Sequence, residues 1–265
     1  MIIGICGLGF VGNAIYTTLK NYNDIDLVIF DLYKNTGSQN DLLKSNILFL
    51  CLPTPYDEVN KEFSKIELEK NLDYLNQNNY SGFVLIKSTV EPNTTNLLSD
   101  KYKNLLLIHN PEFLTARTAI DDFKNQKHII LGISKNCSHD NISIIVNFYK
   151  KYFTDNITIC TSDVSECVKI FSNSFYSVKI QFFTELFLLC NNININYDIV
   201  KDIMLKNNWI NPMHTTIPGP DNQISYGGLC FPKDTNALNS FMIKKNTPNE
   251  VLDATIQERN KMRKE

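Results

Sequence analysis

The first 31 residues constrain the fold more than any other part of the chain. An apolar stretch, Met1–Cys6, is followed at once by the glycine pattern Gly7-Leu8-Gly9-Phe10-Val11-Gly12 and then by residues suited to a helix, up to Lys20. A second apolar stretch, Leu27–Phe30, ends in Asp31. Strand, glycine turn, helix and strand in this order predict the first βαβ unit of an open α/β sheet.

Each glycine has its own predicted role. Gly7 permits a tight turn, Gly9 lets the backbone approach a diphosphate, and Gly12 allows the helix to pack closely on the strand. The diphosphate would bind at the helix N-terminus, where free N–H groups and the helix dipole favour an anion. Asp31 is placed to bind the adenosine ribose, and no arginine lies beside it, which favours NAD over NADP. The alternative is a glycine-rich turn without a ligand. The predicted dinucleotide site comprises Gly7, Gly9, Phe10, Val11, Gly12 and Asp31.

Apolar strands continue to alternate with helical stretches up to residue 162. Further strands are predicted at 47–52, 83–86, 105–108, 128–131 and 157–160. A helix is predicted from Ser64 to Leu75, with Glu67 as the capping-box partner of Ser64. Near-continuous apolar strands separated by helices predict a parallel sheet covered on both faces. Residues 1–162 are therefore predicted to form a Rossmann-like, doubly wound α/β domain.

Polar side chains follow several of these strands. Thr54, Ser88, Thr89 and Glu112 each lie just beyond a strand end. Ligands of open α/β sheets bind beyond the carboxyl ends of the strands. Ordinary loop polarity explains each residue singly, but four at one edge favour a binding site. Thr54, Ser88 and Thr89 are predicted to contact the cofactor.

From Ser162 to about Asn191 the chain contains neither proline nor glycine, and apolar residues recur at helical spacing. The repeat consists of Val164, Val168, Phe171, Phe175, Val178, Phe182, Leu186 and Leu189. This pattern predicts one long helix that opens a smaller all-α domain over residues 163–265. One small domain can hardly bury so long an apolar helix, so we expect it to form the interface of a homodimer. Lys169 and Asn173 share a face of this helix, either as exposed surface or facing a reactive group.

The segment Tyr226-Gly227-Gly228-Leu229-Cys230-Phe231-Pro232-Lys233-Asp234 is the strongest candidate for chemistry. Adjacent glycines let the backbone come close to a ligand. The nearby Lys233 favours the thiolate of Cys230, which is its nucleophilic form, and Asp234 could move protons. If Lys169 overlooks Cys230, its charge could stabilise an oxyanion formed there. The alternative is a turn around a buried cysteine.

Composition narrows the class of protein. The chain has 265 residues, enough for one large or two modest domains. A net charge of −2 gives no general attraction to nucleic acid or acidic membranes. Seven scattered cysteines show neither a C-x-x-C motif nor metal-ligand spacing, which predicts no metal site and favours a reducing compartment. Without a basic leader or an apolar run of about 20 residues, the chain is predicted to be cytoplasmic, with no membrane partner.

Taken in order, these segments resemble the motifs of the UDP-glucose/GDP-mannose dehydrogenase family. They are GLGFVG at 7–12, Pro-Thr-Pro at 53–55, KSTVEPNTT at 87–95, NPEFL at 110–114, E-x-x-K-x-x-x-N at 166–173 and YGGLCFPKD at 226–234. The resemblance spans nearly the whole chain, and the last motif is the most specific. Members of the family oxidise the C6 alcohol of a nucleotide sugar to a carboxylate and reduce two NAD.

The resemblance implies a role for each matching residue. Cys230 would capture the aldehyde as a thiohemiacetal, which a second oxidation converts to a thioester. Lys169 and Asn173 would hold the oxyanion, while Asp234 and Thr89 would position or deprotonate water. The implied catalytic residues are Cys230, Lys169, Asn173, Asp234, Glu112 and Thr89, with Glu112 assisting thioester hydrolysis, and Lys233 joins the cofactor contacts.

UDP-glucose is the expected substrate. Alternatives within the same class are GDP-mannose and a UDP-N-acetylhexosamine. An alternative of another class is an NAD-binding scaffold protein with impaired catalysis.

Four departures from the family pattern bear on these expectations. Ala116 stands where the family has a second glutamate, Asn93 replaces a glycine, and Thr184-Glu185 replaces Asn-Glu. The chain also resembles a short form without the family's third, C-terminal domain. Either the enzyme works with a reduced site, which a dimer partner could complete, or its substrate differs. His214 and the connector at 217–221 are candidates for phosphate contacts.

Overall fold

The computed structural model describes residues 1–138, 142–154 and 156–263. It divides into two compact units, of which the first comprises Met1–Pro55 and Phe63–Lys169 and the second comprises Tyr56–Glu62 and Ile170–Glu265. The predicted domain boundary at residue 162 falls at the start of the long helix, and the division between the two compact units falls a few residues further on, after Lys169. It also assigns the short segment at 56–62 to the second unit. Such a return of the chain leaves no trace in hydrophobic spacing.

The first unit is built on an eight-stranded sheet with the order β10-β9-β8-β7-β4-β1-β2-β3. Its strands are β1 (Ile2–Cys6), β2 (Asp26–Asp31), β3 (Thr36–Gly37), β4 (Ile47–Leu50), β7 (Phe83–Ile86), β8 (Leu106–His109), β9 (Ile129–Ile133) and β10 (Ile157–Thr161). Every strand expected from the apolar runs is present, with ends shifted by one or two residues. The α/β fold class is confirmed.

The sheet is mixed, which corrects the expectation of a wholly parallel one. Strands β2, β1, β4, β7 and β8 run parallel, so their carboxyl ends meet at one edge. Strand β9 runs antiparallel to β8, and β10 runs parallel to β9. Strand β3 runs antiparallel to β2. A buried apolar strand has the same composition in either direction, so the sequence pattern could not reveal the reversal.

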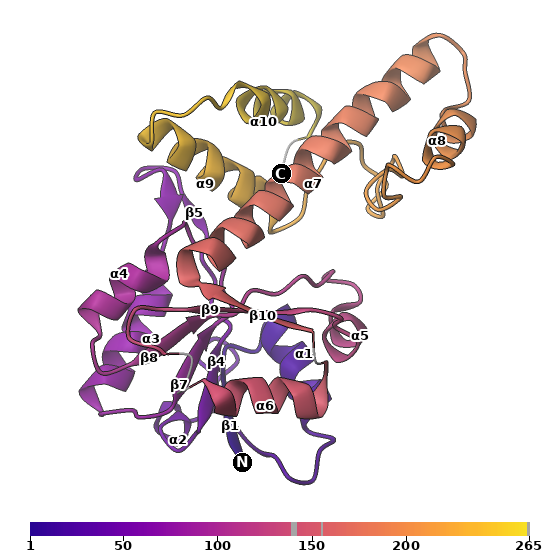
Figure 1. Cartoon of the computed structure of the whole chain (residues 1–265). Coiled ribbons are helices and arrows are strands. Elements are labelled where there is room, and N and C mark those ends of the chain that lie inside the picture. The colour runs from indigo at the N-terminus through magenta and orange to yellow at the C-terminus, as the bar shows by residue number, and fades with distance from the viewer. Residues whose placement is uncertain (139–141, 155, 264–265) are drawn as a thin grey trace. The chain divides into compact units, whose positions relative to one another are not determined.

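Helices cover both faces of the sheet (Figure 1). One face carries α1 (Phe10–Leu19), α5 (Ala119–Lys124) and α6 (Ser143–Tyr152), and the other carries α2 (Gln39–Leu42), α3 (Ile66–Gln77) and α4 (Thr94–Lys101). Each face has its own apolar core: Ile15, Phe123 and Phe148 belong to the first, and Leu72 and Leu98 to the second. The doubly wound arrangement is therefore confirmed.

The predicted capping box at Ser64 is wrong. Helix α3 begins at Ile66, and its N-cap residue, Lys65, makes no side-chain cap bond. The Ser64 amide donates instead to the Pro55 carbonyl at 2.8 Å. Ser64 follows the two-stranded hairpin of β5 (Tyr56–Asp57) and β6 (Glu62–Phe63), and closing that hairpin takes precedence over capping the helix.

The backbone conformation of Asn93 explains why asparagine can replace the glycine of the family pattern at this position. It precedes α4 with a φ of 78°, in the left-handed region that glycine and asparagine adopt most readily. The amides of Asn93 and Thr95 donate to the Glu166 carboxylate at 2.6 and 2.7 Å. Burial raises the pKa of Glu166 to about 7, although these amides partly offset the effect. Asparagine thus preserves the backbone turn that brings both amides to Glu166.

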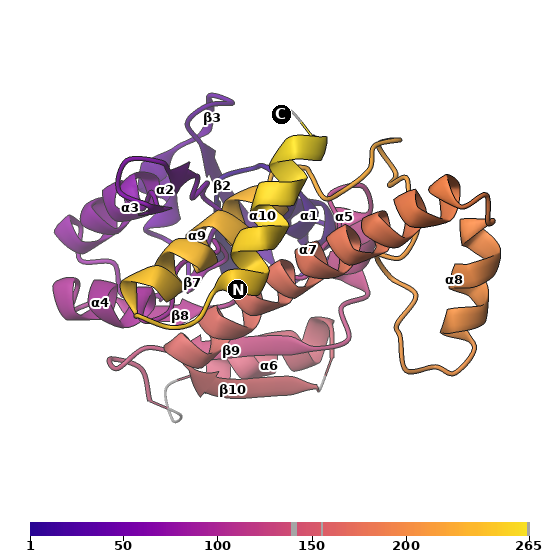
Figure 2. The ribbon, with the colours of Figure 1, turned by 90° about the horizontal axis from the view of Figure 1, so that it is seen from above.

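The second unit is mainly helical. It contains most of α7 (Ser162–Asn192), together with α8 (Tyr197–Leu205), α9 (Phe231–Lys244) and α10 (Glu250–Met262). The long helix ends within one residue of its predicted end. Figure 2 shows α9 and α10 side by side. A small core around Phe183, Tyr197 and Ile217 joins α7 to α8 and to the connector that follows.

Much of the apolar repeat on α7 is exposed. Six of its eight members are between 36% and 62% exposed in the single chain: Val164, Val168, Phe171, Phe175, Phe182 and Leu189. The helix therefore presents a long apolar stripe that the described residues do not cover.

Candidate active site

The glycine loop of the first unit has the geometry that its spacing predicts. Gly7 has a φ of 87°, and a Cβ there would lie 2.4 Å from the Cys51 carbonyl oxygen. A Cβ on Gly12 would lie 1.8 Å from the Gly7 oxygen, so only glycine allows α1 to pack this closely. A Cβ on Gly9 would meet no atom within 4 Å, which leaves its backbone open to a ligand.

Asp31 lies beside this loop at the end of β2 and is 7% exposed. Its carboxylate accepts hydrogen bonds from the amides of Leu8 at 2.6 Å and Lys34 at 2.8 Å. Burial raises the pKa of Asp31, but these two bonds outweigh burial, so its pKa lies below the ordinary value. An ionised carboxylate next to an open glycine turn fits the adenosine half of NAD. Sequence reasoning assigned no role to Lys34. In the structure its ammonium donates to the Leu8 carbonyl at 2.6 Å and so helps to hold the glycine loop.

The predicted cofactor contacts at the carboxyl edge of the sheet help to shape that edge. The Thr54 hydroxyl donates to the Thr89 carbonyl at 2.7 Å, and the Ser88 hydroxyl donates to the Leu52 carbonyl at 2.6 Å. These bonds tie the loop after β4 to the loop after β7. Phe10, at the start of α1, is 59% exposed.

Lys169 and Glu112 form a buried ion pair within the first unit. Lys169 Nζ lies 3.1 Å from Glu112 Oε1, and the two side chains are 5% and 13% exposed. Burial raises the pKa of Glu112, but Lys169 and the Leu114 amide lower it more, so it falls below its ordinary value. Lys169 Nζ also lies 5.2 Å from the centre of the Phe113 ring. The interpretation of Lys169 as exposed surface is therefore wrong.

In the second unit, Asn173 and Asp234 are joined by a side-chain hydrogen bond. Asn173 Nδ2 donates to Asp234 Oδ2 at 2.6 Å, and Lys233 Nζ contacts Asp234 Oδ1 at 2.5 Å. Asp234 is fully buried and Asn173 is 6% exposed. A buried carboxylate is stable only when it is paired and hydrogen-bonded, and these donors meet that need. Lys233, predicted to contact the cofactor, is bonded to Asp234 in this structure.

Cys230 caps the N-terminus of α9 and is exposed. The Asp234 amide donates to the Cys230 carbonyl at 2.9 Å, so Cys230 precedes the buried Asp234 by one helical turn. The alternative of a turn around a buried cysteine is wrong. By contrast, burial raises the pKa of both Cys6 and Cys51 to about 12, which makes their thiols poor nucleophiles. Cys230 is the cysteine best placed to react.

Each unit thus contributes its own set of candidate groups. The first brings together the glycine loop, Asp31 and the ion pair of Glu112 with Lys169. The second brings together Cys230, Asp234, Asn173 and Lys233. Sequence reasoning did not single out Lys87, whose side chain is buried and donates to Asn110 Oδ1 at 3.0 Å, because its only signal was a lysine directly after an apolar strand.

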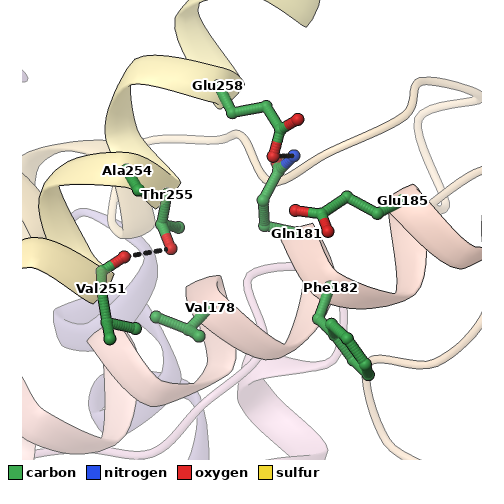
Figure 3. Close-up of a pocket in the computed structure, with 8 residues that line it drawn as sticks. All are labelled: Val178, Gln181, Phe182, Glu185, Val251, Ala254, Thr255 and Glu258. Atoms are coloured by element: carbon green, nitrogen blue, oxygen red, sulfur yellow. Dashed lines mark hydrogen bonds between the residues drawn. The ribbon is translucent and has the colours of Figure 1, made fainter.

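The start of the cysteine segment is held between α7 and α10. The Ser225 hydroxyl donates to Gln181 Oε1 at 2.5 Å. Gln181 Nε2 in turn donates to Glu258 Oε2 at 3.0 Å, the bond drawn between these two side chains in Figure 3. Arg259 Nε donates to the Tyr226 carbonyl at 3.2 Å. Beside these bonds lies a groove of about 240 Å³, lined by Val178, Gln181, Phe182, Glu185, Val251, Ala254, Thr255 and Glu258. The backbone just before the two glycines is therefore anchored from two helices.

The suggested phosphate contacts remain predictions. The His214 ring packs against Tyr176, with the ring centres 4.8 Å apart, and against Phe231 at 5.7 Å. Burial and the nearby Lys179 lower the pKa of His214, so its imidazole is neutral at pH 7. In the 217–221 connector, Asp221 pairs with Arg263.

Two further features concern partners. Within the described ranges, no group of three or more His, Cys, Asp or Glu side chains is arranged to hold a metal ion. No described helix is both long and apolar enough to cross a membrane.

The Glu185→Gln variant is expected to unfold at a higher temperature than the wild type at about pH 8 and at the same temperature at about pH 4. A hydrogen bond with the neighbouring Glu258 raises the pKa of Glu185 from 4.5 to about 7 in the folded chain. The folded state therefore keeps a proton that the unfolded state loses, and stability falls as the pH rises from about 4.5 to 7. Glutamine avoids this loss because it carries no charge.

Thermal unfolding across this pH range checks the expectation. Glu250→Gln, an exposed position on α10, is the control and should show no such pH-dependent gain. Identical unfolding midpoints for wild type and Glu185→Gln at both pH values would contradict the raised pKa of Glu185 in the folded chain.

Comparison with known proteins supports the family resemblance. A model of the NAD binding domain of the UDP-glucose/GDP-mannose dehydrogenase family matches residues 31–153, and a model of the central domain of the same family matches residues 163–261. UDP-glucose 6-dehydrogenase of Campylobacter jejuni is 28% identical and is matched over 100% of this chain and 73% of its own length. The Rickettsia bellii enzyme of that name is 30% identical, over 84% of this chain and 51% of its own length. The chain thus spans between half and three quarters of these two relatives.

Solved structures share the fold. A UDP-glucose dehydrogenase from Pyrobaculum islandicum has a TM-score of 0.82 at 20% identity, covering 97% of this chain and 67% of that one. A 3-hydroxyisobutyrate dehydrogenase from Mycobacterium tuberculosis has a TM-score of 0.75 at 11% identity, covering 98% of this chain and 92% of that one. The two family models and the first two relatives agree: the chain belongs to the UDP-glucose/GDP-mannose dehydrogenase family and carries that family's NAD-binding and central domains.

Proposed function

We propose that this protein is an NAD-dependent nucleotide-sugar 6-dehydrogenase whose substrate is UDP-glucose and whose nucleophile is Cys230. The observation that carries the proposal is the exposed Cys230 at the N-terminus of α9, one turn from the buried Asp234. A helix N-terminus favours negative charge, and the sulfur needs that charge in order to attack. The relatives named UDP-glucose 6-dehydrogenase support the choice of substrate.

NAD, when bound at the glycine loop and Asp31, would accept the hydride, which carries both electrons, removed in each oxidation. Asp31 would bind the ribose, and Gly9 would lie against the diphosphate. Phe10, Val11, Thr54, Ser88 and Thr89 are proposed to line the remainder of this site.

The first oxidation breaks a C6–H bond, from which hydride leaves to the acceptor, and the O–H bond, from which the proton passes to water, and so converts the C6 alcohol to an aldehyde. The Cys230 thiolate then adds to the aldehyde carbon, which forms a carbon–sulfur bond and leaves an oxyanion. Lys169 supplies positive charge, and Asn173 supplies an N–H donor, for that oxyanion. Covalent capture keeps a reactive aldehyde in place for the second oxidation.

The second oxidation removes hydride from the thiohemiacetal carbon and yields a thioester. Water then adds to the carbonyl, the carbon–sulfur bond breaks, and the carboxylate and the thiolate are released. Glu112 is an ionised carboxylate at neutral pH and can accept the proton of the attacking water. Thr89 and Asp234 are proposed to position this water.

Two kinds of alternative to this proposal, a different nucleotide sugar and a protein without catalysis, are each supported by a separate observation. The structure of a GDP-mannose dehydrogenase from Pseudomonas aeruginosa shares the fold, with a TM-score of 0.68, so the sugar could be GDP-mannose. A UDP-N-acetylhexosamine is a further possibility of the same class. The alternative of an NAD-binding scaffold rests on Ala116, which stands where the family has a second glutamate.

The wild type is expected to form two NADH for each UDP-glucose consumed and to release the sugar acid. Cys230→Ser should lose acid formation by about a thousandfold or more, because a serine hydroxyl is ionised far less than a thiol near neutral pH. NADH absorbance together with chromatography of the nucleotide sugars gives both yields.

Cys160→Ser, at a partly buried position on β10, is the matched control and should keep the wild-type ratio. If Cys230→Ser formed the sugar acid at the wild-type rate, Cys230 would not be the nucleophile. NAD binding without turnover on any nucleotide sugar would favour the scaffold.

We also propose that two copies of the chain associate through the apolar stripe on α7, from about Ser162 to Asn191. Soluble proteins rarely expose large contiguous apolar patches, and symmetric pairing buries the same surface on both copies. The protein is proposed to act in the cytoplasm, since the buried Cys6, Cys137 and Cys190 are free thiols, as expected in a reducing compartment.

Phe175→Lys is expected to convert the dimer to a monomer, because it places a charge in the middle of the stripe, where the native ring is 62% exposed in the single chain. Sedimentation velocity measures the change. Val59→Lys is the control, since Val59 is 89% exposed but lies away from α7 in sequence, beside β5. A monomeric wild type, or an unchanged Phe175→Lys dimer, would contradict the proposed interface.

A further inference from the structure

Lys87 is a buried cation to which the proposed reaction assigns no role. It directly follows β7, and only 4% of its surface is exposed. Its amide donates to the Leu50 carbonyl at 2.9 Å, which extends the pairing of β4 with β7. A lysine ammonium is costly to bury without oxygen partners, so its contacts indicate what it does.

Those contacts lie on the segment that leads into Glu112. Lys87 Nζ donates to Asn110 Oδ1 at 3.0 Å and lies 3.4 Å from the Pro111 carbonyl oxygen. Asn110 Oδ1 also accepts from the Tyr149 hydroxyl at 2.5 Å, and Asn110 Nδ2 donates to the Ile130 carbonyl at 2.8 Å. Lys87 therefore holds the main chain one residue before Glu112, and Asn110 connects that point to β9 and α6.

The charge of Lys87 acts on the same carboxylate. Glu112 is held directly by Lys169 at 3.1 Å and by the Leu114 amide at 2.6 Å, and Lys87 adds a second nearby cation that lowers the pKa of Glu112. Burial lowers the pKa of Lys87 to about 8, while Glu112 opposes that effect and Lys169 adds to it. The half-buried Cys51 also lies close to Lys87, and His109 lies close to both lysines.

We propose that Lys87 is a positioning residue for Glu112, fixing the main chain at Pro111 and keeping the carboxylate turned toward Lys169. Lys87 need not touch the substrate for this role. Its effect on thioester hydrolysis rests on the proposed function, whereas its effect on Glu112 does not.

Carbon-13 titration of the glutamate side-chain carboxyls in the ligand-free protein tests the direct effect, with Glu112→Gln used to assign the Glu112 signal. In Lys87→Met the pKa of Glu112 is expected to rise, because a neighbouring cation that lowers it is lost. Lys135→Met, at an exposed lysine paired with Asp100 in the same unit, is the control and should leave the signal unchanged.

Lys87→Gln keeps a hydrogen-bond donor but no charge, and it replaces Lys87→Met should the latter fail to fold. An unchanged pKa of Glu112 in whichever variant folds would overturn the proposal. This result is independent of the substrate, so it decides the role of Lys87 even if no nucleotide sugar is oxidised.

Steady-state kinetics test the consequence for catalysis. With UDP-glucose, the Lys87 variant is expected to lower kcat about tenfold or more while KM stays within about twofold, since only a water-activating group is disturbed. Acid quenching during turnover should also trap more thioester than in the wild type. A raised KM with unchanged kcat would overturn the positioning role, whereas an inactive wild type would count against the proposed function alone.

Discussion

The hydrogen bond from Asn173 to Asp234 is the contact on which the candidate groups of the second unit depend. Asp234 is fully buried, and a buried carboxylate that loses its donors destabilises a protein by about 3 to 5 kcal/mol. Asn173 and Lys233 supply those donors, so the first turn of α9 is held against α7. Cys230 caps that turn, and its position follows from the same contact.

A second buried carboxylate obeys the same rule in the first unit. Glu112 is paired with Lys169, which lies one helical turn before Asn173 on α7. One helix therefore supplies a cationic donor and a neutral donor from adjacent turns of one face. Neither side chain is ordinary exposed surface, because Lys169 pairs with the Glu112 carboxylate and Asn173 donates a hydrogen bond to the buried Asp234 carboxylate. The sequence E-x-x-K-x-x-x-N encodes this spacing directly.

Much of the fold and of the candidate site could be predicted from the sequence, for physical reasons. Gly7 and Gly12 sit where a side chain would collide with backbone, so the spacing of these glycines fixes the turn. The long helix was predictable because an uninterrupted apolar repeat admits no other regular structure. Buried strands were located because few other segments are continuously apolar.

The remainder depends on contacts between segments distant in sequence. The reversed direction of β9 and β10 has no signature in composition, and the place where α7 passes from one unit to the other depends on tertiary packing. The sequence assigned no role to Lys87, because its partners Asn110 and Pro111 follow a different strand. Likewise, Ser64 matched a helix-capping pattern, but its amide donates to the Pro55 carbonyl beside the adjoining hairpin.

The central claim is that Cys230 carries the substrate as a thioester between the second oxidation and hydrolysis. The most direct measurement is the mass of the Glu112→Gln variant, quenched in acid while it turns over UDP-glucose and NAD. The account predicts an acyl adduct of the oxidised nucleotide sugar on the peptide that contains Cys230, because hydrolysis is slowed after the thioester has formed. Acid release without an adduct on that peptide, or an adduct on another residue, would contradict it.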